Sequence, residues 1–244
     1  MFVALHNTAE TTMTKLKAMP YGKPLWAGPQ WPKLTQAEIL NKVKQAAERA
    51  GWELTKPKIA TISNQTVCYW HMAHPQAGSK AGGQPYTLGF CSGHDRKLNP
   101  AFFVGVEDKP AGLFFIPTRI SLPKITAEGF DKDLDRFYKK MTVERIVATV
   151  NKPRVKLMAA KCTTGDGLLL AIECMRAKGK PFKASGYKDF EYNWLQLSEP
   201  TLYKLLASLQ FGTMAGPTIK QMDHAYECFQ IVAKYYKNKL KNAA

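Results

Sequence analysis

The sequence has few cysteines and no long apolar run, and these two absences exclude several classes of protein. Its five cysteines are scattered and odd in number, which is not typical of a disulfide framework and suits a reducing compartment. No segment approaches the roughly 18 apolar residues that a membrane helix needs, and the first residues lack the apolar core of a secretion signal. We therefore expect a soluble, cytoplasmic protein with no membrane partner.

Acidic residues are also scarce. The 244 residues include 35 Lys and Arg against 19 Asp and Glu, which gives a formal net charge of +16. A domain this basic attracts polyanions, because each phosphate that it neutralises releases counterions. The basic residues are spread along the whole chain, with local clusters at 139–140, 152–156 and 234–241. Nucleic acid is therefore the first partner to consider, and the alternative is that the charge only keeps the protein soluble.

Motifs of the common catalytic sites are missing as well. We find no phosphate-binding glycine loop and no nucleophile elbow. His94 and Asp95 are adjacent, but such a pair on a turn more often caps or solvates it than acts as a base and its orienting partner. Asp131, Asp133 and Asp135 resemble the start of a calcium loop, yet the glycine and the later glutamate are absent, which favours the polar face of a helix start. We expect no enzyme and no cofactor.

The clearest local prediction is a helix over 35–50. Thr35 and Glu38 form a capping-box motif, and the apolar residues after them recur at helical spacing. Gly51 is a good stop for this helix. The segment before it, 1–33, contains prolines, glycines and two tryptophans, which favour an irregular arm.

The rest of the chain predicts an α+β fold. From residue 52 to about 120, short β-rich runs separated by turn residues indicate a twisted antiparallel sheet of four or five strands. From 123 onward the apolar spacing is helical to the end of the chain. We therefore expect an α+β domain with its N-terminal arm over 1–122, followed by an all-helical domain or subdomain over 123–244.

Two Cys-x-x-His steps raise the question of a metal site. Cys68 with His71 and Cys91 with His94 would supply two thiolates and two imidazoles, the ligand count that zinc needs. The two aromatic residues between Cys68 and His71 favour a strand, however, and in a strand these two side chains point to opposite faces. Ordinary sheet residues are the preferred interpretation, and a zinc-stabilised module is the alternative.

A strand over this segment would also create a candidate stacking surface. Alternation places Cys68, Trp70 and Met72 on one face and Val67, Tyr69 and His71 on the other. If the helices cover only the first face, Tyr69 and His71 lie exposed beside nearby lysines. Bases stack on such rings while lysines follow the backbone, which is typical of single-strand binding.

Several short motifs resemble a widespread family of phage and plasmid proteins of unknown function. The resemblance covers most of the chain discontinuously, and its matching positions are Trp26, Leu34, Thr35, Gly51, Trp52, His94, Asp95, Trp194 and Leu195. The chain departs from that family at Ser92 and Gly93, where Asn and Ser are usual, and at AGLFFIP, where the family has a Phe-Val-Cys-Asp-Asn run. The family implies a phage setting in a host cell, and the architecture is loosely similar to that of phage single-strand annealing proteins.

Together these features predict a phage-type protein of the host cytoplasm that binds nucleic acid, with single-stranded DNA favoured, through a basic face of the β-rich half. Its activity would be strand annealing or strand protection, with oligomer formation as an option. The residues expected to contact nucleic acid are Lys56, Lys58, Tyr69, Trp70, Arg96, Lys97, Arg119, Lys152 and Arg154. The alternative is an interaction protein that binds and inhibits or redirects a host protein.

Overall fold

The computed structural model describes residues 9–18, 34–62, 65–93, 100–108, 113–122, 129–176, 184–213 and 218–242. Its strands are β1 (Ala9–Thr11), β2 (Glu53–Leu54), β3 (Lys58–Ile62), β4 (Gln65–Ala73), β5 (Lys80–Ala81), β6 (Gln84–Gly93), β7 (Ala101–Asp108) and β8 (Leu113–Ser121). Its helices are α1 (Met13–Ala18), α2 (Gln36–Arg49), α3 (Phe130–Lys140), α4 (Val143–Ile146), the π-helical turn η1 (Val147–Asn151), α5 (Lys152–Ala159), α6 (Thr164–Arg176), α7 (Ala184–Leu195), α8 (Leu202–Thr213) and α9 (Thr218–Asn242).

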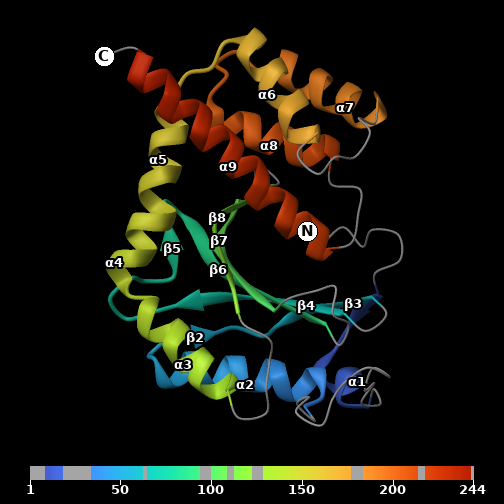
Figure 1. The fold of residues 1–244 in the computed structure, drawn as a ribbon, viewed down its shortest axis with the longest axis vertical. Helices are drawn as coiled ribbons and strands as arrows, with labels where there is room; N and C mark the ends of the chain where they lie inside the picture. The colour runs from blue at the N-terminus through green and yellow to red at the C-terminus, as the bar shows by residue number, and fades with distance from the viewer. Residues whose placement is uncertain are drawn as a thin grey trace.

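The α+β class is confirmed (Figure 1). The strands form one antiparallel sheet with the order β1-β3-β4-β6-β7-β8, and the short strands β2 and β5 pair with β4 and β6. The β-rich runs expected from the sequence correspond to the long strands β3, β4, β6, β7 and β8. The predicted helix over 35–50 is α2, and the Thr35–Glu38 capping box forms as expected.

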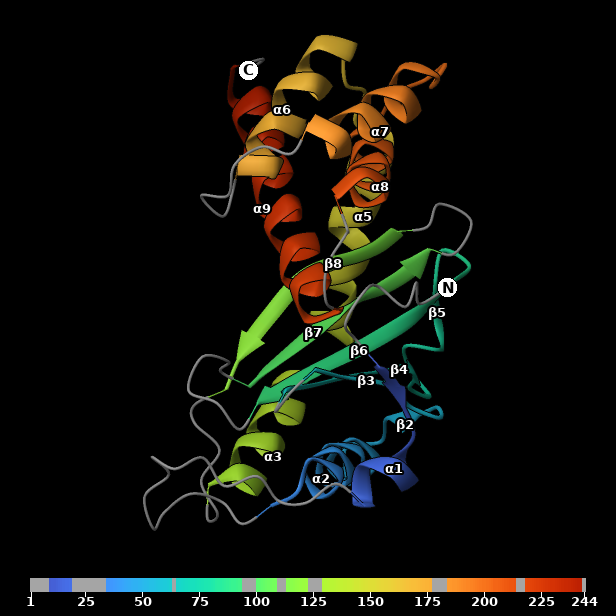
Figure 2. The same cartoon turned by 90° about the vertical axis from the view of Figure 1, so that its right-hand side faces the viewer.

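Both faces of the sheet are covered by helices, so the expectation of an exposed face is wrong. Helices α1, α2 and α3 cover one face, and the N-terminal part of α9 lies across the other (Figure 2). Met222 of α9 packs at Gly89 of β6, where a Cβ atom on the strand would lie 2.9 Å from the Met222 sulfur and would displace it. The absence of a side chain at Gly89 thus lets α9 approach the sheet closely.

Strand β8 contains a bulge opposite Gly105 of β7. Val104 pairs with Thr118 and Val106 pairs with Phe115, so β8 has one more residue than β7 in this stretch. A Cβ atom on Gly105 would overlap the backbone carbonyl of Phe115, and the bulge therefore requires glycine here. Pro117 is tolerated within the bulge because β8 is an edge strand.

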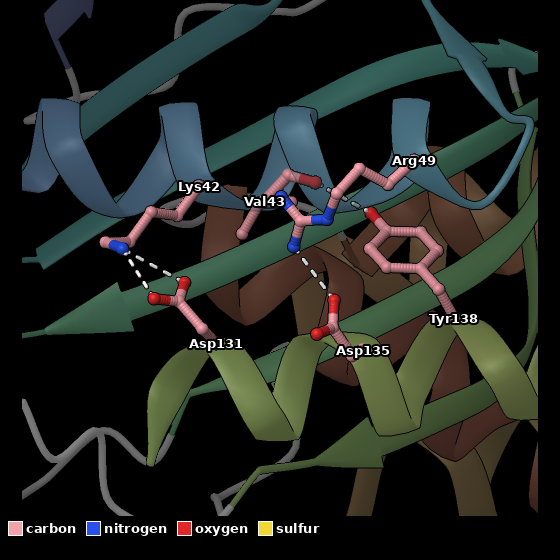
Figure 3. Close-up of polar contacts among 6 residues, drawn as sticks. All are labelled: Lys42, Val43, Arg49, Asp131, Asp135 and Tyr138. Carbon is pink, nitrogen blue, oxygen red and sulfur yellow. Dashed lines mark hydrogen bonds and ion pairs between the residues drawn. The ribbon is translucent and has the colours of Figure 1, made fainter. Parts of the chain in front are cut away.

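Helix α3 is held against α2 by ion pairs and a hydrogen bond, which Figure 3 shows. Lys42 Nζ lies 2.7 Å from an Asp131 carboxylate oxygen, and Arg49 Nη2 lies 2.8 Å from Asp135. The buried Tyr138 hydroxyl donates to the carbonyl of Val43 at 3.2 Å. The two aspartates therefore lie on the polar face of a helix start, as expected from the sequence, and their charges are matched by α2.

The two halves of the chain are joined by a buried polar cluster of Asp108, Arg154 and Tyr203. Arg154 Nε donates to the Tyr203 hydroxyl at 3.2 Å, and that hydroxyl donates to Asp108 Oδ2 at 3.0 Å. Arg154 Nη2 also lies 3.5 Å from Asp108 Oδ2. One apolar cluster likewise includes residues from both halves. In the described part of the chain, no helix is long and apolar enough to span a membrane.

Candidate nucleic-acid interface

Residues 143–159 form one helical column along the side of the sheet, built from α4, η1 and α5. The column follows α3 and runs along one edge of the molecule in Figure 1. Pro153 has no N–H with which to bond the carbonyl of Thr149, and the chain makes the π turn η1 just before it. The turn lets Asn151 Nδ2 donate to the Tyr86 hydroxyl at 2.9 Å, which fixes the column to β6.

The outer side of this column and its two flanks carry a set of basic residues that we call the basic strip. Its members are Lys139, Lys140, Arg145, Lys152, Lys156 and Lys161, and all are exposed. Lys152 and Lys156 are one helical turn apart and share a side of α5, and Arg145 lies in α4, on the other side of the η1 turn. At about 1.5 Å per residue, the helical column is roughly 25 Å long.

Little negative charge offsets the basic strip. Glu144 is the only acidic residue between positions 139 and 161. It is fully exposed, and a hydrogen bond from Thr142 lowers the pKa of its carboxyl, so it remains ionised at neutral pH. None of the six basic side chains forms an ion pair with another described residue. The strip is therefore a row of cations available to an external anion.

Elsewhere in the described part of the chain, many acidic residues form ion pairs with basic residues. The pairs are Lys42–Asp131, Lys44–Glu48, Arg49–Asp135, His71–Glu107, Arg119–Asp223, Arg136–Asp133, Arg154–Asp108 and Lys239–Asp166. In each pair, a carboxylate of the protein itself offsets the charge of the basic side chain. The net positive charge consequently remains on cations without such partners, and the strip contains six of these between positions 139 and 161.

Among the residues expected to contact phosphate, Lys152 lies in the strip but Arg154 does not. They are two positions apart on α5, so they point to different sides of the helix. Lys152 is exposed, whereas Arg154 is 6% exposed and is paired with Asp108. The expected phosphate contact of Arg154 is wrong, because its guanidinium is enclosed in the cluster that joins the two halves.

Two further predicted contacts on the sheet are wrong because α9 and α2 pack over them, and a third predicted residue, Arg119, is paired with α9. Tyr69 and Trp70 are each 1% exposed, so neither ring can stack on a base. Arg119 is half-buried, and its Nε lies 2.9 Å from Asp223 of α9, which offsets its charge. The stacking surface expected on the β-rich half is therefore covered, and for Tyr69 the physical reason is the second helical layer that α9 provides.

The remaining predicted residues do not join the strip. Lys56 and Lys58 are exposed, and Lys58 Nζ lies 5.2 Å from the centroid of the Tyr69 ring. Lys58 is the first residue of β3 and Lys56 lies two positions before it, whereas the strip lies on and beside the helical column 143–159. Arg96 and Lys97 lie outside the described residues.

The proposed zinc ligands do not converge. In the β4–β6 ladder, Cys68 pairs with Phe90 and Cys91 pairs with Val67. Paired residues share a face, so the two thiols point to opposite faces of the sheet. His71 Nε2 is instead bonded to Glu107 at 2.7 Å, and His94 lies outside the described residues. In the described part of the chain, no group of three or more metal-ligating side chains occurs. The zinc alternative is therefore overturned.

Five strip residues were absent from the predicted site, namely Lys139, Lys140, Arg145, Lys156 and Lys161. The signal that could have found them is local charge, because the segment 139–161 contains seven basic residues and one acidic residue. Helical periodicity would then have separated the buried Arg154 from the exposed members.

No family model, no curated protein and no solved structure matches this chain. The resemblance to the phage and plasmid family therefore stays a prediction from the sequence motifs.

Proposed function

We propose that the protein binds nucleic acid through the basic strip. The single observation that carries this proposal is the row of six exposed cations on and beside one helical column, opposed by one acidic residue. The column is rigid because it is fixed to the sheet by Asn151 and Arg154. A rigid row of cations matches a regular row of phosphates better than cations on a mobile tail.

The mode of contact that the strip supports is recognition of the phosphate backbone. Lys and Arg at these positions can neutralise phosphates and release counterions, a contact that carries no sequence information. The segment 139–161 contains no aromatic residue that could stack on a base. We therefore propose binding with little sequence preference, and we assign the protein no catalytic step.

The finer features of the function are proposals from the sequence. They are a phage origin, a place in the host cytoplasm, a preference for single-stranded DNA, and annealing or protection of strands. Base stacking by Tyr69 or Trp70 no longer supports the preference for single strands, since both rings are buried. The phosphate contacts proposed for the strip are available in both single strands and duplexes.

The test is fluorescence anisotropy with nuclease-treated protein and labelled oligonucleotides, single-stranded and double-stranded, at low and moderate salt. We expect binding at low salt that weakens steeply as salt increases. The triple variant Arg145→Ala, Lys152→Ala and Lys156→Ala should weaken it by about a hundredfold, since each exposed cation–phosphate contact contributes on the order of 1 kcal/mol.

A matched control keeps the same loss of charge but spares the strip. Lys15→Ala, Lys17→Ala and Lys188→Ala remove three exposed cations from α1 and α7, which lie away from α5 in Figure 1. This control should change the affinity by less than about threefold, because charges beyond a Debye length are largely screened. Equal losses in both variants, or no binding at low salt, would overturn the strip as the site.

A second candidate function is binding of an acidic protein, and one observation favours it. Val155 and Met158 are 61% and 45% exposed on α5, the helix that carries Lys152 and Lys156. Apolar side chains beside cations suit a protein surface that is both apolar and acidic. Replacing Val155 and Met158 with Ser would weaken binding to such a partner, and it would leave affinity for oligonucleotides nearly unchanged.

A further inference from the structure

Strand β8 has an open outer edge over its last residues. The sheet order places β1 and β8 at the two borders, and β1 has only three residues whereas β8 has nine. An edge strand presents backbone N–H and C=O groups that no neighbouring strand of the sheet uses. Figure 2 shows the arrowhead of β8 at the border of the sheet. The longer border strand is therefore the one that offers room for a further strand.

The first part of β8 is protected against such pairing, and the last part is not. In the first part, Phe115 packs against aromatic rings of α8 and α9, and the bulge and Pro117 interrupt the regular edge. Beyond Pro117 the pairing with β7 is regular again, residues 118–120 are half-buried, and Ser121 is exposed. The open edge is thus a short segment at the end of β8.

The hydrogen bonds to β7 decide which backbone groups of this segment point outward. The Leu122 N–H donates to the carbonyl of Pro100 at 2.8 Å, so residue 122 directs its backbone groups toward β7. In an antiparallel ladder this direction alternates from one residue to the next. Arg119 and Ser121 therefore direct their N–H and C=O groups away from the sheet. On this outer side, no described residue forms a backbone hydrogen bond with either of them.

We propose that this edge, residues 118–122, pairs with the same edge of a second copy of the chain to form a two-fold dimer with one continuous sheet. Two antiparallel copies of one strand are related by a two-fold axis, so such an interface is self-complementary and closed. With the axis at Ile120, Arg119 pairs with Ser121 of the partner subunit, and every outward N–H of the two segments meets a carbonyl. The proposal does not depend on nucleic-acid binding, because no residue of the basic strip takes part in it.

The sequence around Ile120 favours a second copy as the partner. Pro117 and Pro123 lie three positions to either side of it, and neither has an N–H, so the paired segment ends at the same place in both copies. Arg119 is the only charged residue of β8, and Asp223 offsets its charge, which leaves this edge neutral on a protein of net charge +16. An axis at Arg119 would instead set like charges opposite each other, which destabilises a strand pair.

The first test is the mass of the nuclease-treated protein in analytical ultracentrifugation, from low micromolar to near-millimolar concentration. We expect the mass to double as concentration rises. The dimer should also strengthen with salt, because salt screens the repulsion between two basic copies. Nucleic-acid binding has the opposite salt dependence, which distinguishes a dimer held together by residual nucleic acid. A monomeric mass at every concentration would overturn the proposal, and a strand of another protein would then be the candidate for this edge.

The variant Ile120→Cys tests the position of the axis. Residues on the axis face each other as a non-hydrogen-bonded pair with Cα atoms about 4.5 Å apart, a separation that a disulfide spans. Mild oxidation should therefore link two copies of this variant. Thr118→Cys is the control on the same face, and it should not cross-link, since its two copies lie about 14 Å apart. The native cysteines are buried, and the wild-type chain gives the background. A dimer without the Ile120→Cys cross-link, or equal cross-linking of both variants, would overturn pairing through this edge.

Two substitutions at Ser121 separate the backbone contact from the side chain. Ser121→Pro removes one outward N–H and leaves the ladder with β7 intact, so it should weaken dimer formation by about tenfold or more. Ser121→Ala keeps the N–H and should change the dissociation constant by less than about threefold. Circular dichroism checks that both variants are folded. Equal dissociation constants for the two folded variants would contradict the proposed pairing.

Discussion

Asp108 is the residue on which the contact between the two halves depends most directly. It is 7% exposed and accepts a hydrogen bond from Tyr203 while matching the charge of Arg154. Asp108→Asn keeps the shape but leaves the buried guanidinium without a counter-charge. We expect this variant to lose about 3 kcal/mol or more of unfolding free energy, measured by urea denaturation.

A matched control removes an exposed carboxylate in the same way. Glu53→Gln in β2 should change the unfolding free energy by less than about 0.5 kcal/mol, because this side chain is exposed. If Asp108→Asn were as mild as Glu53→Gln, the buried cluster would not stabilise the fold, and the docking of α5 and α8 on β7 would depend on apolar contacts alone.

Because of Tyr203, the stability that this cluster contributes depends on pH in the alkaline range. Burial raises the pKa of its hydroxyl from the ordinary value of 10.0 to about 12. Between these values the unfolded chain releases the proton while the folded protein keeps it, so the contribution is complete below pH 10 and is lost as pH rises toward 12. Between about pH 10 and 12, Tyr203→Phe should lose less stability than the wild type. Circular dichroism monitors the unfolding of both proteins across this pH range. Parallel pH curves for the two proteins would contradict this.

Single residues also show that the sequence alone could not predict which side chains are exposed. Lys152 and Arg154 are two positions apart in one basic cluster, and charge alone cannot tell which of them is exposed. The buried Asp108 that decides the matter is distant along the chain, in β7. Tyr69 was predicted on the correct face of β4, the one opposite Cys68, but its burial depends on α9, which no local pattern places there.

At the scale of elements, the bulge between β7 and β8 depends on Gly105. Because a Cβ atom here would overlap the Phe115 backbone, Gly105→Ala must displace β8. We expect a loss of about 2–3 kcal/mol in unfolding free energy, measured by denaturation. Gly165→Ala in α6 is the control, since a Cβ atom there meets no neighbour, and it should be neutral or stabilising by up to about 1 kcal/mol. Similar effects in both variants would show that the bulge tolerates a side chain.

The elements that sequence patterns predicted well are those whose causes are local. The capping box of α2 is a contact between Thr35 and Glu38, three residues apart, and the five long strands follow from β-rich runs between turn residues. The helical column over 143–159 was predicted as helical, but its π turn was not. That turn combines Pro153 with a bond from Asn151 to Tyr86 in another element, so its geometry needs the tertiary structure.

At the scale of the whole molecule, charge composition indicated a class of partner but not a surface. The value of +16 is a sum over the chain. Which cations remain available depends on the ion pairs that folding creates, including Lys42–Asp131, Arg49–Asp135 and Arg119–Asp223. Each of these pairs joins different elements, so none of them could be inferred from spacing. The basic strip is the group of cations on and beside one helical column that have no such partner after these pairs have formed.

This view of the charge makes a quantitative prediction for the salt dependence of nucleic-acid binding. If only the six cations of the strip contact phosphates, the slope of log affinity against log salt is no steeper than about −5 for a duplex and about −4 for a single strand. Removing Arg145, Lys152 and Lys156 should then reduce its magnitude by about 2 to 3, measured by titrations at several salt concentrations. A much steeper slope that the triple variant leaves unchanged would mean that the net charge of the whole surface binds nucleic acid.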